Sequence, residues 1–169
     1  HKGILDKIMV VGKALGADAK AAELSAKVDA DLTAAQALTA GVTTRKRVLF
    51  ILSMQDGKIL GAGTGTAANG IITLAGAKNA LEGFSGYRPL SDESVLIANP
   101  DIILMMDRGG DHSVANAELF AHPAIATTTA GKAKALVRMD GGYLLGFGPR
   151  TAGAVRDLAA AFYGDQIKH

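Results

Sequence analysis

The residues best suited to bind a ligand gather in one mid-chain segment, residues 83–95, with the sequence GFSGYRPLSDESV. Arg88 offers a planar, permanently charged fork that suits carboxylates, while Phe84 and Tyr87 offer flat apolar faces. A second segment, GFGPRT at residues 146–151, again places an arginine beside a proline and near an aromatic ring. Such residues fit a large, flat, partly anionic ligand. The alternative is an ordinary surface loop whose arginine pairs with a nearby acid.

A glycine-rich segment is a second candidate, because Gly63, Gly65 and Ala68 satisfy the loose G-x-G-x-x-G/A pattern that cradles dinucleotide phosphates. The pattern normally follows its strand tightly, whereas here roughly ten residues separate it from Ser53. The acid expected about 20 residues further on would be Glu82, which follows no obvious strand. We therefore favour a wide turn with close helix packing. A nucleotide-binding regulatory domain that uses this segment is the alternative.

Metal binding and hydrolysis have little support in the sequence. The chain has four histidines and no cysteine, which excludes disulfides and thiolate chemistry. His112 lies near Asp107 and Asp111 in a group that could bind a metal loosely, but we favour a helix-capping role for Asp111. The serines show no triad spacing, and neither G-x-S-x-G nor H-E-x-x-H occurs. We therefore expect neither a metal site nor an enzyme.

Composition limits the classes of partner. Lysine and arginine total 18 against 16 acids, and the resulting net charge of +2 is too balanced for a nucleic-acid-binding surface. Apolar residues make up 49% of the 169 residues, which is enough for one domain with a real core. Apolar runs fall short of the roughly 18 residues of a membrane span, so we expect a chain that is not membrane-embedded.

The elements that would position these residues alternate between helices and strands. Residues 47–53 and 101–107 contain continuous apolar runs, typical of strands buried on both faces of a parallel sheet. We expect further strands at 135–139 and 143–147, helices at 3–15, 18–40, 66–75, 91–98, 114–121 and 152–163, and turns or loops at 57–65, 83–90, 108–113 and 127–134. This order predicts an α/β fold with a mainly parallel sheet flanked by helices. Ligand loops are expected at the carboxyl ends of its strands, at 54–65, 107–113 and 141–150.

Several stretches together carry a family resemblance. They are VLFILS, AGTGTAANGIITLAGAKNAL, GFSGYRPLSDESVL before NPD and a strand, TTTAGKAKALVRMD, and LLGFGPRT before the last helix. In this order and spacing, from about residue 3 to residue 163, the chain resembles the periplasmic haemin-binding proteins of bacterial ABC haem importers.

The resemblance implies one lobe of a class III periplasmic binding protein. Residues 1–16 would be the helix that joins two lobes, and residues 17–169 the carboxyl-terminal α/β lobe. The amino-terminal lobe, which usually supplies the tyrosine that ligates haem iron, would be absent from this chain, as would a signal peptide. Haem would be the transported ligand, held in the cleft between the lobes in the periplasm.

Individual residues also take roles from the resemblance. Arg88 would reach a haem propionate or polarise the opposite ligand, with Arg150 as a weaker candidate in the cleft. Tyr87 and Met54 would line its apolar wall, and Met54 stands where some members carry a histidine. Glu93, in the first turn of a helix, would dock onto arginines of the membrane permease, although the helix dipole alone could explain an acid there.

The implied mechanism is binding and delivery, without catalysis, to the subunits of an ABC transporter permease. A corrinoid-binding or ferric-siderophore-binding protein of the same fold is the nearest alternative. A dimer of this chain through an exposed face of the lobe is a further possibility to be tested by light scattering.

Overall fold

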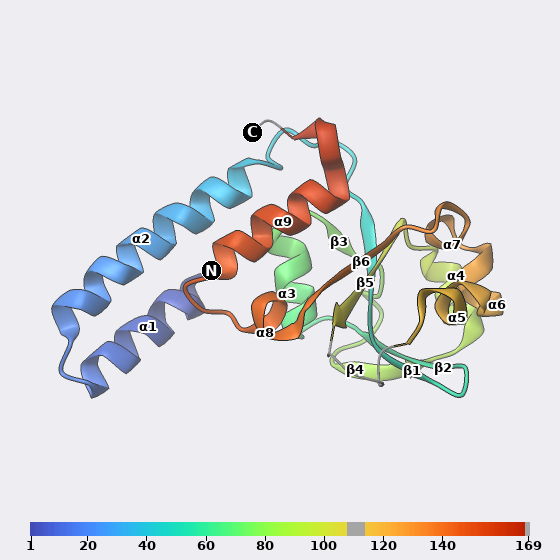
Figure 1. The fold of residues 1–169 in the computed structure, drawn as a ribbon, viewed down its shortest axis with the longest axis horizontal. Coiled ribbons are helices and arrows are strands. Elements are labelled where there is room, and N and C mark those ends of the chain that lie inside the picture. Colours follow the sequence, from blue (N-terminus) through green and yellow to red (C-terminus); the bar gives the residue numbers. More distant parts are fainter. Residues whose placement is uncertain (108–113, 168–169) are drawn as a thin grey trace.

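A computed structural model describes residues 1–107 and 114–167 (Figure 1). Its helices are α1 (Lys2–Ala14), α2 (Asp18–Ala37), α3 (Ala67–Leu74), α4 (Asp92–Ala98), α5 (Asn116–Ala121), α6 (Pro123–Thr127), α7 (Thr129–Ala133), α8 (Gly141–Leu145), α9 (Thr151–Tyr163) and the 3-10 turn η1 (Gly164–Gln166). Its strands are β1 (Arg47–Gln55), β2 (Lys58–Ala62), β3 (Lys78–Asn79), β4 (Tyr87–Leu90), β5 (Ile102–Asp107) and β6 (Leu136–Asp140). The expected alternation of strands and helices is confirmed.

The strands form a single mixed sheet in the order β4-β2-β1-β5-β6, with β3 paired to the start of β1. Strand β1 pairs in parallel with β3 and β5, and β5 with β6, which confirms the expected mainly parallel sheet. The short strand β3 was not predicted. The sheet continues past β1 with antiparallel β2 and β4, which fall in segments predicted to be turn and loop. Asp56 and Gly57 both have positive φ, of 50° and 73°, and so form the tight hairpin turn that starts β2.

Two other predicted elements are wrong. The strand expected at residues 143–147 is the short helix α8, because the Asp140 side chain accepts a hydrogen bond from the Tyr143 N–H at 2.8 Å and caps it. The loop expected at 127–134 contains the helix α7, capped by Thr128 through the Gly131 N–H at 3.0 Å. Local side-chain caps therefore decide both of these segments.

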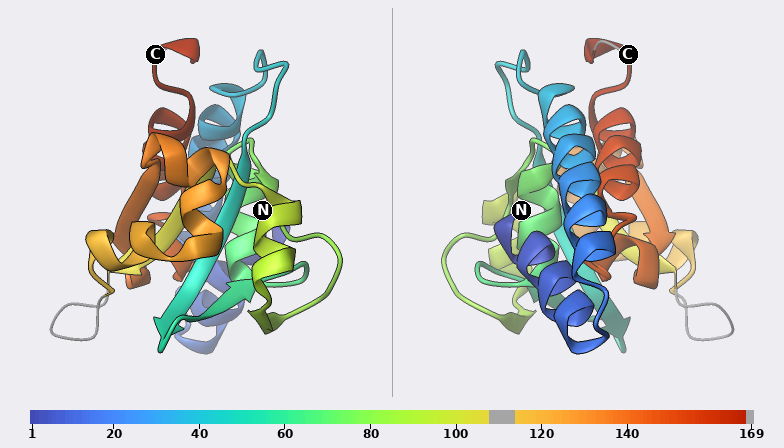
Figure 2. Two further views of the ribbon diagram at one scale, coloured as in Figure 1. Left: turned by 90° about the vertical axis from the view of Figure 1, so that its right-hand side faces the viewer. Right: turned by 90° about the vertical axis from the view of Figure 1, so that its left-hand side faces the viewer.

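The core lies on both faces of the sheet. Val48 and Phe50 of β1 pack into the cluster beneath α2, α3 and α9, whereas Leu49 and Ile51 pack beneath α4, α5 and α6. All four side chains are fully buried, as the continuous apolar run predicts. Figures 1 and 2 show these two groups of helices on opposite sides of the sheet.

Helices α1 and α2 form an antiparallel pair that extends away from the sheet (Figure 1). Helix α2 packs along α9, and α1 packs against α2. At their closest approach, a Cβ on Gly12 would overlap the Cβ of Ala21. None of the helices that the structure describes has the length and apolar character needed to cross a membrane.

Candidate functional site

Tyr87 and Arg88 lie on β4, the exposed edge strand of the sheet. Tyr87 pairs with Ala62 and Arg88 with Gly61. Successive strand residues project to opposite faces, so these two side chains point to different sides of the sheet. Both are exposed, and the Arg88 guanidinium lies 5.4 Å from the centroid of the Phe84 ring. Arg88 and Phe84 thus form a cation–π pair, while Tyr87 faces the other side.

The glycine-rich segment packs against the segment that leads into β4. A Cβ on Gly63 would overlap the carbonyl oxygen of Phe84. The Gly63 N–H donates to the Gly86 carbonyl at 2.8 Å, and the Thr64 N–H donates to the Phe84 carbonyl at 2.9 Å. These amides already have partners within the chain, so the geometry favours the packing explanation over a phosphate cradle.

Met54 lies inside the core instead of lining a binding surface. Its side chain is 5% exposed and belongs to the cluster beneath α4, α5 and α6. The pairing of β1 with β2 shifts register between Ile51 and Ser53. A bulge of this kind reverses the alternation of faces, which turns Met54 to the same face as Ile51. In this conformation Met54 therefore offers no surface to a ligand.

Arg150 lies in the turn between α8 and α9. Its guanidinium is 5.9 Å from the centroid of the Tyr143 ring. The Tyr143 hydroxyl donates to Asp157 Oδ2 at 2.9 Å. Burial raises the pKa of the Tyr143 phenol above its ordinary value, and the hydrogen bond and negative charge of Asp157 raise it further. A hollow of about 160 Å³, lined by residues that include Tyr143, Phe147 and Arg150, adjoins this group.

Arg88 and Arg150 each lie over an aromatic ring of their own, Phe84 and Tyr143. Arg88 is on β4, and Arg150 follows α8, which starts directly after β6 at the other edge of the sheet. Three strands lie between β4 and β6, but the segment after α8 packs on α3, where a Cβ on Gly70 would lie 3.4 Å from the Phe147 ring. The candidate site thus consists of two separate arginine–aromatic pairs. Sequence reasoning found both arginines and missed Tyr143, which lies in a segment predicted to be a strand.

Glu93 is exposed in the first turn of α4, where an acid was expected. The Ser91 hydroxyl accepts from the Ser94 N–H at 3.1 Å and caps this helix. The preceding acid, Asp92, lies 3.9 Å from Nε2 of the buried His122. Glu93 therefore projects from a helix start that is fixed from two sides.

Metal ligands do not cluster in the part of the chain that the structure describes, where no group of three potential ligands occurs. Asp111 and His112, the residues considered for a loose metal site, lie outside the described residues. His122 hydrogen-bonds the Gly57 carbonyl at 2.8 Å, and His1 contacts Asp29 at 2.8 Å.

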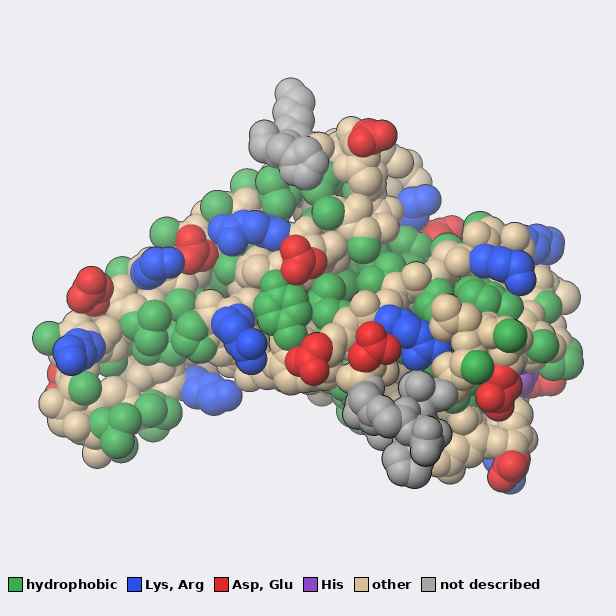
Figure 3. Space-filling view, in the orientation of Figure 1, with side chains coloured by type: hydrophobic (Ala, Val, Ile, Leu, Met, Phe, Trp, Pro, Cys, Tyr) green, Lys and Arg blue, Asp and Glu red, His purple; other side chains and the backbone are tan. Residues whose placement is uncertain are grey.

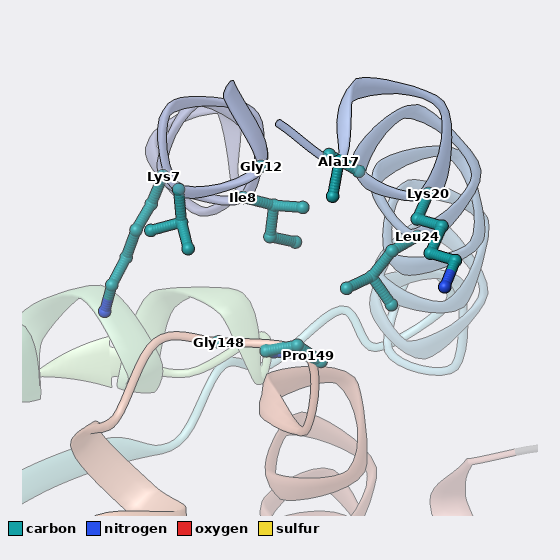
Figure 4. Close-up of a pocket in the computed structure, with 10 residues that line it drawn as sticks. Lys7, Ile8, Gly12, Ala17, Lys20, Leu24, Gly148 and Pro149 are labelled. Carbon is teal, nitrogen blue, oxygen red and sulfur yellow. The ribbon is translucent and has the colours of Figure 1, made fainter. Parts of the chain in front are cut away.

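An apolar cavity of about 350 Å³ lies between α1, α2 and the Gly148–Pro149 turn, and the same turn lines the hollow beside Arg150. Figure 4 shows Ile8 and Leu24 pointing into this space, with Lys7 and Lys20 on its two sides. The cavity is lined mainly by the projecting helix pair and reaches the Arg150 segment only through this turn.

Comparison with known proteins decides the family. A family model described as "Periplasmic binding protein" matches residues 2–143. The chain belongs to the periplasmic binding protein family. This is a family of binding proteins, which confirms the expectation that the chain is not an enzyme.

Solved structures of periplasmic binding proteins resemble the chain closely. The periplasmic heme-binding protein BhuT, in complex with two hemes, is 38% identical with a TM-score of 0.89, covering 95% of this chain and 62% of its own. The periplasmic heme-binding protein RhuT from Roseiflexus sp. RS-1 is 37% identical with a TM-score of 0.88, covering 94% of this chain and 61% of its own. HutB of Vibrio cholerae, also a periplasmic heme-binding protein, is 29% identical with a TM-score of 0.84, covering 96% and 63%.

More distant relatives share the architecture. The uncharacterized ABC transporter substrate-binding lipoprotein YvrC of Bacillus subtilis (strain 168) is 26% identical over 98% of this chain and 51% of its own. An ABC-type Fe3+-hydroxamate transport system from Saccharomonospora viridis is 16% identical with a TM-score of 0.78, covering 94% of this chain and 55% of its own, which is a likeness of fold alone. The chain therefore spans between half and two thirds of the length of these periplasmic binding proteins.

Proposed function

We propose that this chain forms one lobe of the substrate-binding protein of an ABC importer, and that the whole protein binds haem outside the cytoplasm, in the periplasm, and delivers it. The observation that carries the proposal is the 38% identity to the heme complex of BhuT over 95% of the chain. The 37% identity to the periplasmic heme-binding protein RhuT over 94% of the chain supports the same ligand class.

The chemistry of the exposed arginines supports this ligand class. Haem is a wide apolar plate with two carboxylates, so a site for it needs flat apolar faces and one or two cations. Arg88 beside Phe84 and Arg150 beside Tyr143 supply both, and both arginines are exposed. Tyr87 remains a candidate for the apolar wall, and Met54 would need to leave the core to join it.

The test is a haemin titration of the chain, followed by the Soret absorption. We expect weak binding, with a dissociation constant on the order of micromolar, because the chain spans only 62% of BhuT. Arg88→Gln and Arg150→Gln should each weaken binding by about three- to tenfold, since each loses a charge-assisted contact. Binding that neither change affects would contradict the proposed roles.

A permease docking role for Glu93 is part of the same proposal. An exposed carboxylate on a fixed helix start suits a basic patch on a membrane partner. Glu93→Arg should reduce stimulation of the reconstituted transporter's ATPase while leaving haemin affinity unchanged. Glu118→Arg is the matched control, because Glu118 is also exposed in the first turn of a short helix. Equal loss in both variants would rule out a specific contact.

Ferric siderophores or corrinoids are the second candidate ligands, favoured by the shared fold of the Fe3+-hydroxamate transport system. Competition with haemin separates the two: a siderophore or corrinoid that displaces haemin at lower concentration would replace haem in the proposal.

We also propose that residues 1–16 form the helix that joins the two lobes, although α2 is longer than α1.

A further inference from the structure

The side chain of Tyr143 packs closely against α9. A Cβ on Gly153 would lie 2.5 Å from the Tyr143 hydroxyl, so only glycine allows the phenol to approach the helix this closely. Asp157, one helical turn further along the same face, accepts the hydroxyl hydrogen bond at 2.9 Å. Asp157 therefore holds the oxygen end of Tyr143 against α9, at a point where Gly153 leaves room for it.

The ring of Tyr143 remains partly exposed beside a cation. The Arg150 guanidinium lies over it at 5.9 Å from the centroid. Among the described residues, no carboxylate oxygen lies within 4.0 Å of the Arg150 guanidinium, which is the distance limit for an ion pair. Its charge is thus available to an incoming anion, while the ring offers an apolar face next to it.

This group lies where ligands bind in sheets of this kind. Helix α8 begins directly after β6, at the carboxyl end of a parallel strand. The Tyr143 N–H is fixed by Asp140 at the end of that strand. Backbone and side chain of Tyr143 are therefore both positioned from the ordered body of the fold.

We infer that the ring of Tyr143 contacts the bound porphyrin, beside a porphyrin carboxylate that Arg150 binds. Asp157 occupies the phenol oxygen through its hydrogen bond, so that Tyr143 is not an iron ligand. The inference rests on the proposed function, because it names the part of the ligand that this edge of the sheet recognises. It assigns a role to Tyr143 and Asp157, which the family resemblance leaves without one.

The charges around the phenol agree with this arrangement. Burial raises the pKa of Tyr143 most, followed by the hydrogen bond to Asp157 and its charge, whereas Arg150 and Arg156 act in the opposite direction. A tyrosine ligates ferric haem as the phenolate. A phenol that donates to a carboxylate is disfavoured in that form, so the ring face is what Tyr143 offers.

Two substitutions and two probes test the contact. Tyr143→Ala removes the ring and should weaken binding of haemin and of metal-free protoporphyrin alike, by about tenfold. Tyr143→Phe keeps the ring and should change both affinities by less than about twofold, with an unchanged Soret band. Circular dichroism of each variant checks that the fold is retained.

The outcomes separate this inference from the proposed function. A wild-type chain that binds neither porphyrin contradicts the proposed function and the inference with it. A wild-type chain that binds both, with affinities that Tyr143→Ala leaves unchanged, contradicts the inference alone. So does Tyr143→Phe if it weakens haemin binding selectively or shifts the Soret band, because the oxygen would then be an iron ligand.

The role of Asp157 has its own readout in the ligand-free chain. Asp157→Asn should lower the pKa of one tyrosine in a spectrophotometric titration of tyrosinate. That titration step should disappear in the double variant with Tyr143→Phe. An unchanged titration curve would overturn the claim that Asp157 occupies the phenol oxygen through a hydrogen bond.

Discussion

His122 joins three segments that are distant in sequence. Its side chain is 8% exposed, and Nε2 donates to the Gly57 carbonyl at 2.8 Å, in the hairpin turn. Its Nδ1 accepts from the Ala124 N–H at 3.2 Å and caps α6, and Asp92 of α4 lies 3.9 Å from Nε2. The two hydrogen bonds define one neutral tautomer, with the proton on Nε2.

We predict that His122→Ala lowers the free energy of unfolding by about 2 kcal/mol, because it leaves a carbonyl and a cap amide without partners in a buried position. Urea denaturation measures this. His1→Ala is the matched control: His1 hydrogen-bonds Asp29 at the surface, and its loss should cost less than about 1 kcal/mol. Similar losses of unfolding free energy in both variants would show that the buried hydrogen bonds of His122 add nothing to stability.

Tyr143 predicts a pH dependence of stability. Its pKa in the folded chain is raised above the ordinary value of 10.0, first by burial and then by Asp157. The folded chain therefore holds the phenol proton more tightly than the unfolded chain does. This contribution to stability is complete below about pH 10 and is lost as the pH rises through the folded pKa.

Denaturation experiments at about pH 9 and about pH 11 should thus show a smaller decrease in unfolding free energy for Asp157→Asn than for the wild type. Arg156→Gln should act in the opposite direction and enlarge the decrease, because the Arg156 charge lowers the pKa of Tyr143. Identical pH profiles in all three chains would exclude a coupling between these charges.

The site residues differ in how far the sequence could predict them. Arg88, Arg150 and Glu93 are exposed, as residue type and local context suggested. Met54 could not be placed, because the bulge after Ile51 changes the face on which it lies, and a bulge has no clear signature in β1. The pairing of a tyrosine with Asp157 depends on tertiary contact, which no spacing in the sequence encodes.

At the level of elements, burial on both faces made β1 and β5 predictable from their continuous apolar runs. Strand β4 has no such run: its residues are mostly exposed, and it exists because β2 provides a partner. The short helices α7 and α8 depend on single capping side chains in segments of only five residues. Strands that depend on a partner strand, and helices that depend on a capping side chain, are thus the elements that hydrophobic periodicity does not predict.

The contact between α1 and α2 gives a prediction at the same scale. Gly12→Ala adds a Cβ that would overlap Ala21, so the helices must separate. We expect a loss of about 1–3 kcal/mol in stability from overpacking, although alanine favours helix over glycine by roughly 1 kcal/mol.

The matched control is Gly3→Ala in the same helix, where a Cβ would meet nothing within 4 Å. Its stability should be unchanged or slightly raised. Thermal unfolding followed by circular dichroism distinguishes the two variants. A Gly12→Ala chain as stable as the Gly3→Ala chain would mean that α1 does not pack on α2 as closely as described.

In the molecule as a whole, exposed hydrophobic side chains are concentrated in the projecting helix pair. Val10 and Val11 of α1 are 69% and 51% exposed, and Leu15, which follows α1, is 75% exposed. Leu24 of α2 opens onto the adjoining cavity. Figure 3 shows hydrophobic side chains lying open along this part of the molecule. Of the eight large hydrophobic side chains exposed in the described part of the chain, five lie in this pair or its connecting turn, and such a concentration of apolar surface marks an association site.

We therefore predict that the chain dimerises with rising concentration through α1, and that light scattering detects the doubled mass. Leu15→Lys should shift the equilibrium to monomer, because dimerisation would bury its charge against apolar side chains. Ile97→Lys is the matched control, since Ile97 is equally open at 74% but lies on α4, on the other side of the sheet. If Ile97→Lys and not Leu15→Lys abolishes the dimer, the contact is made by α4, and Glu93 then lies within the self-association surface instead of being free for a permease.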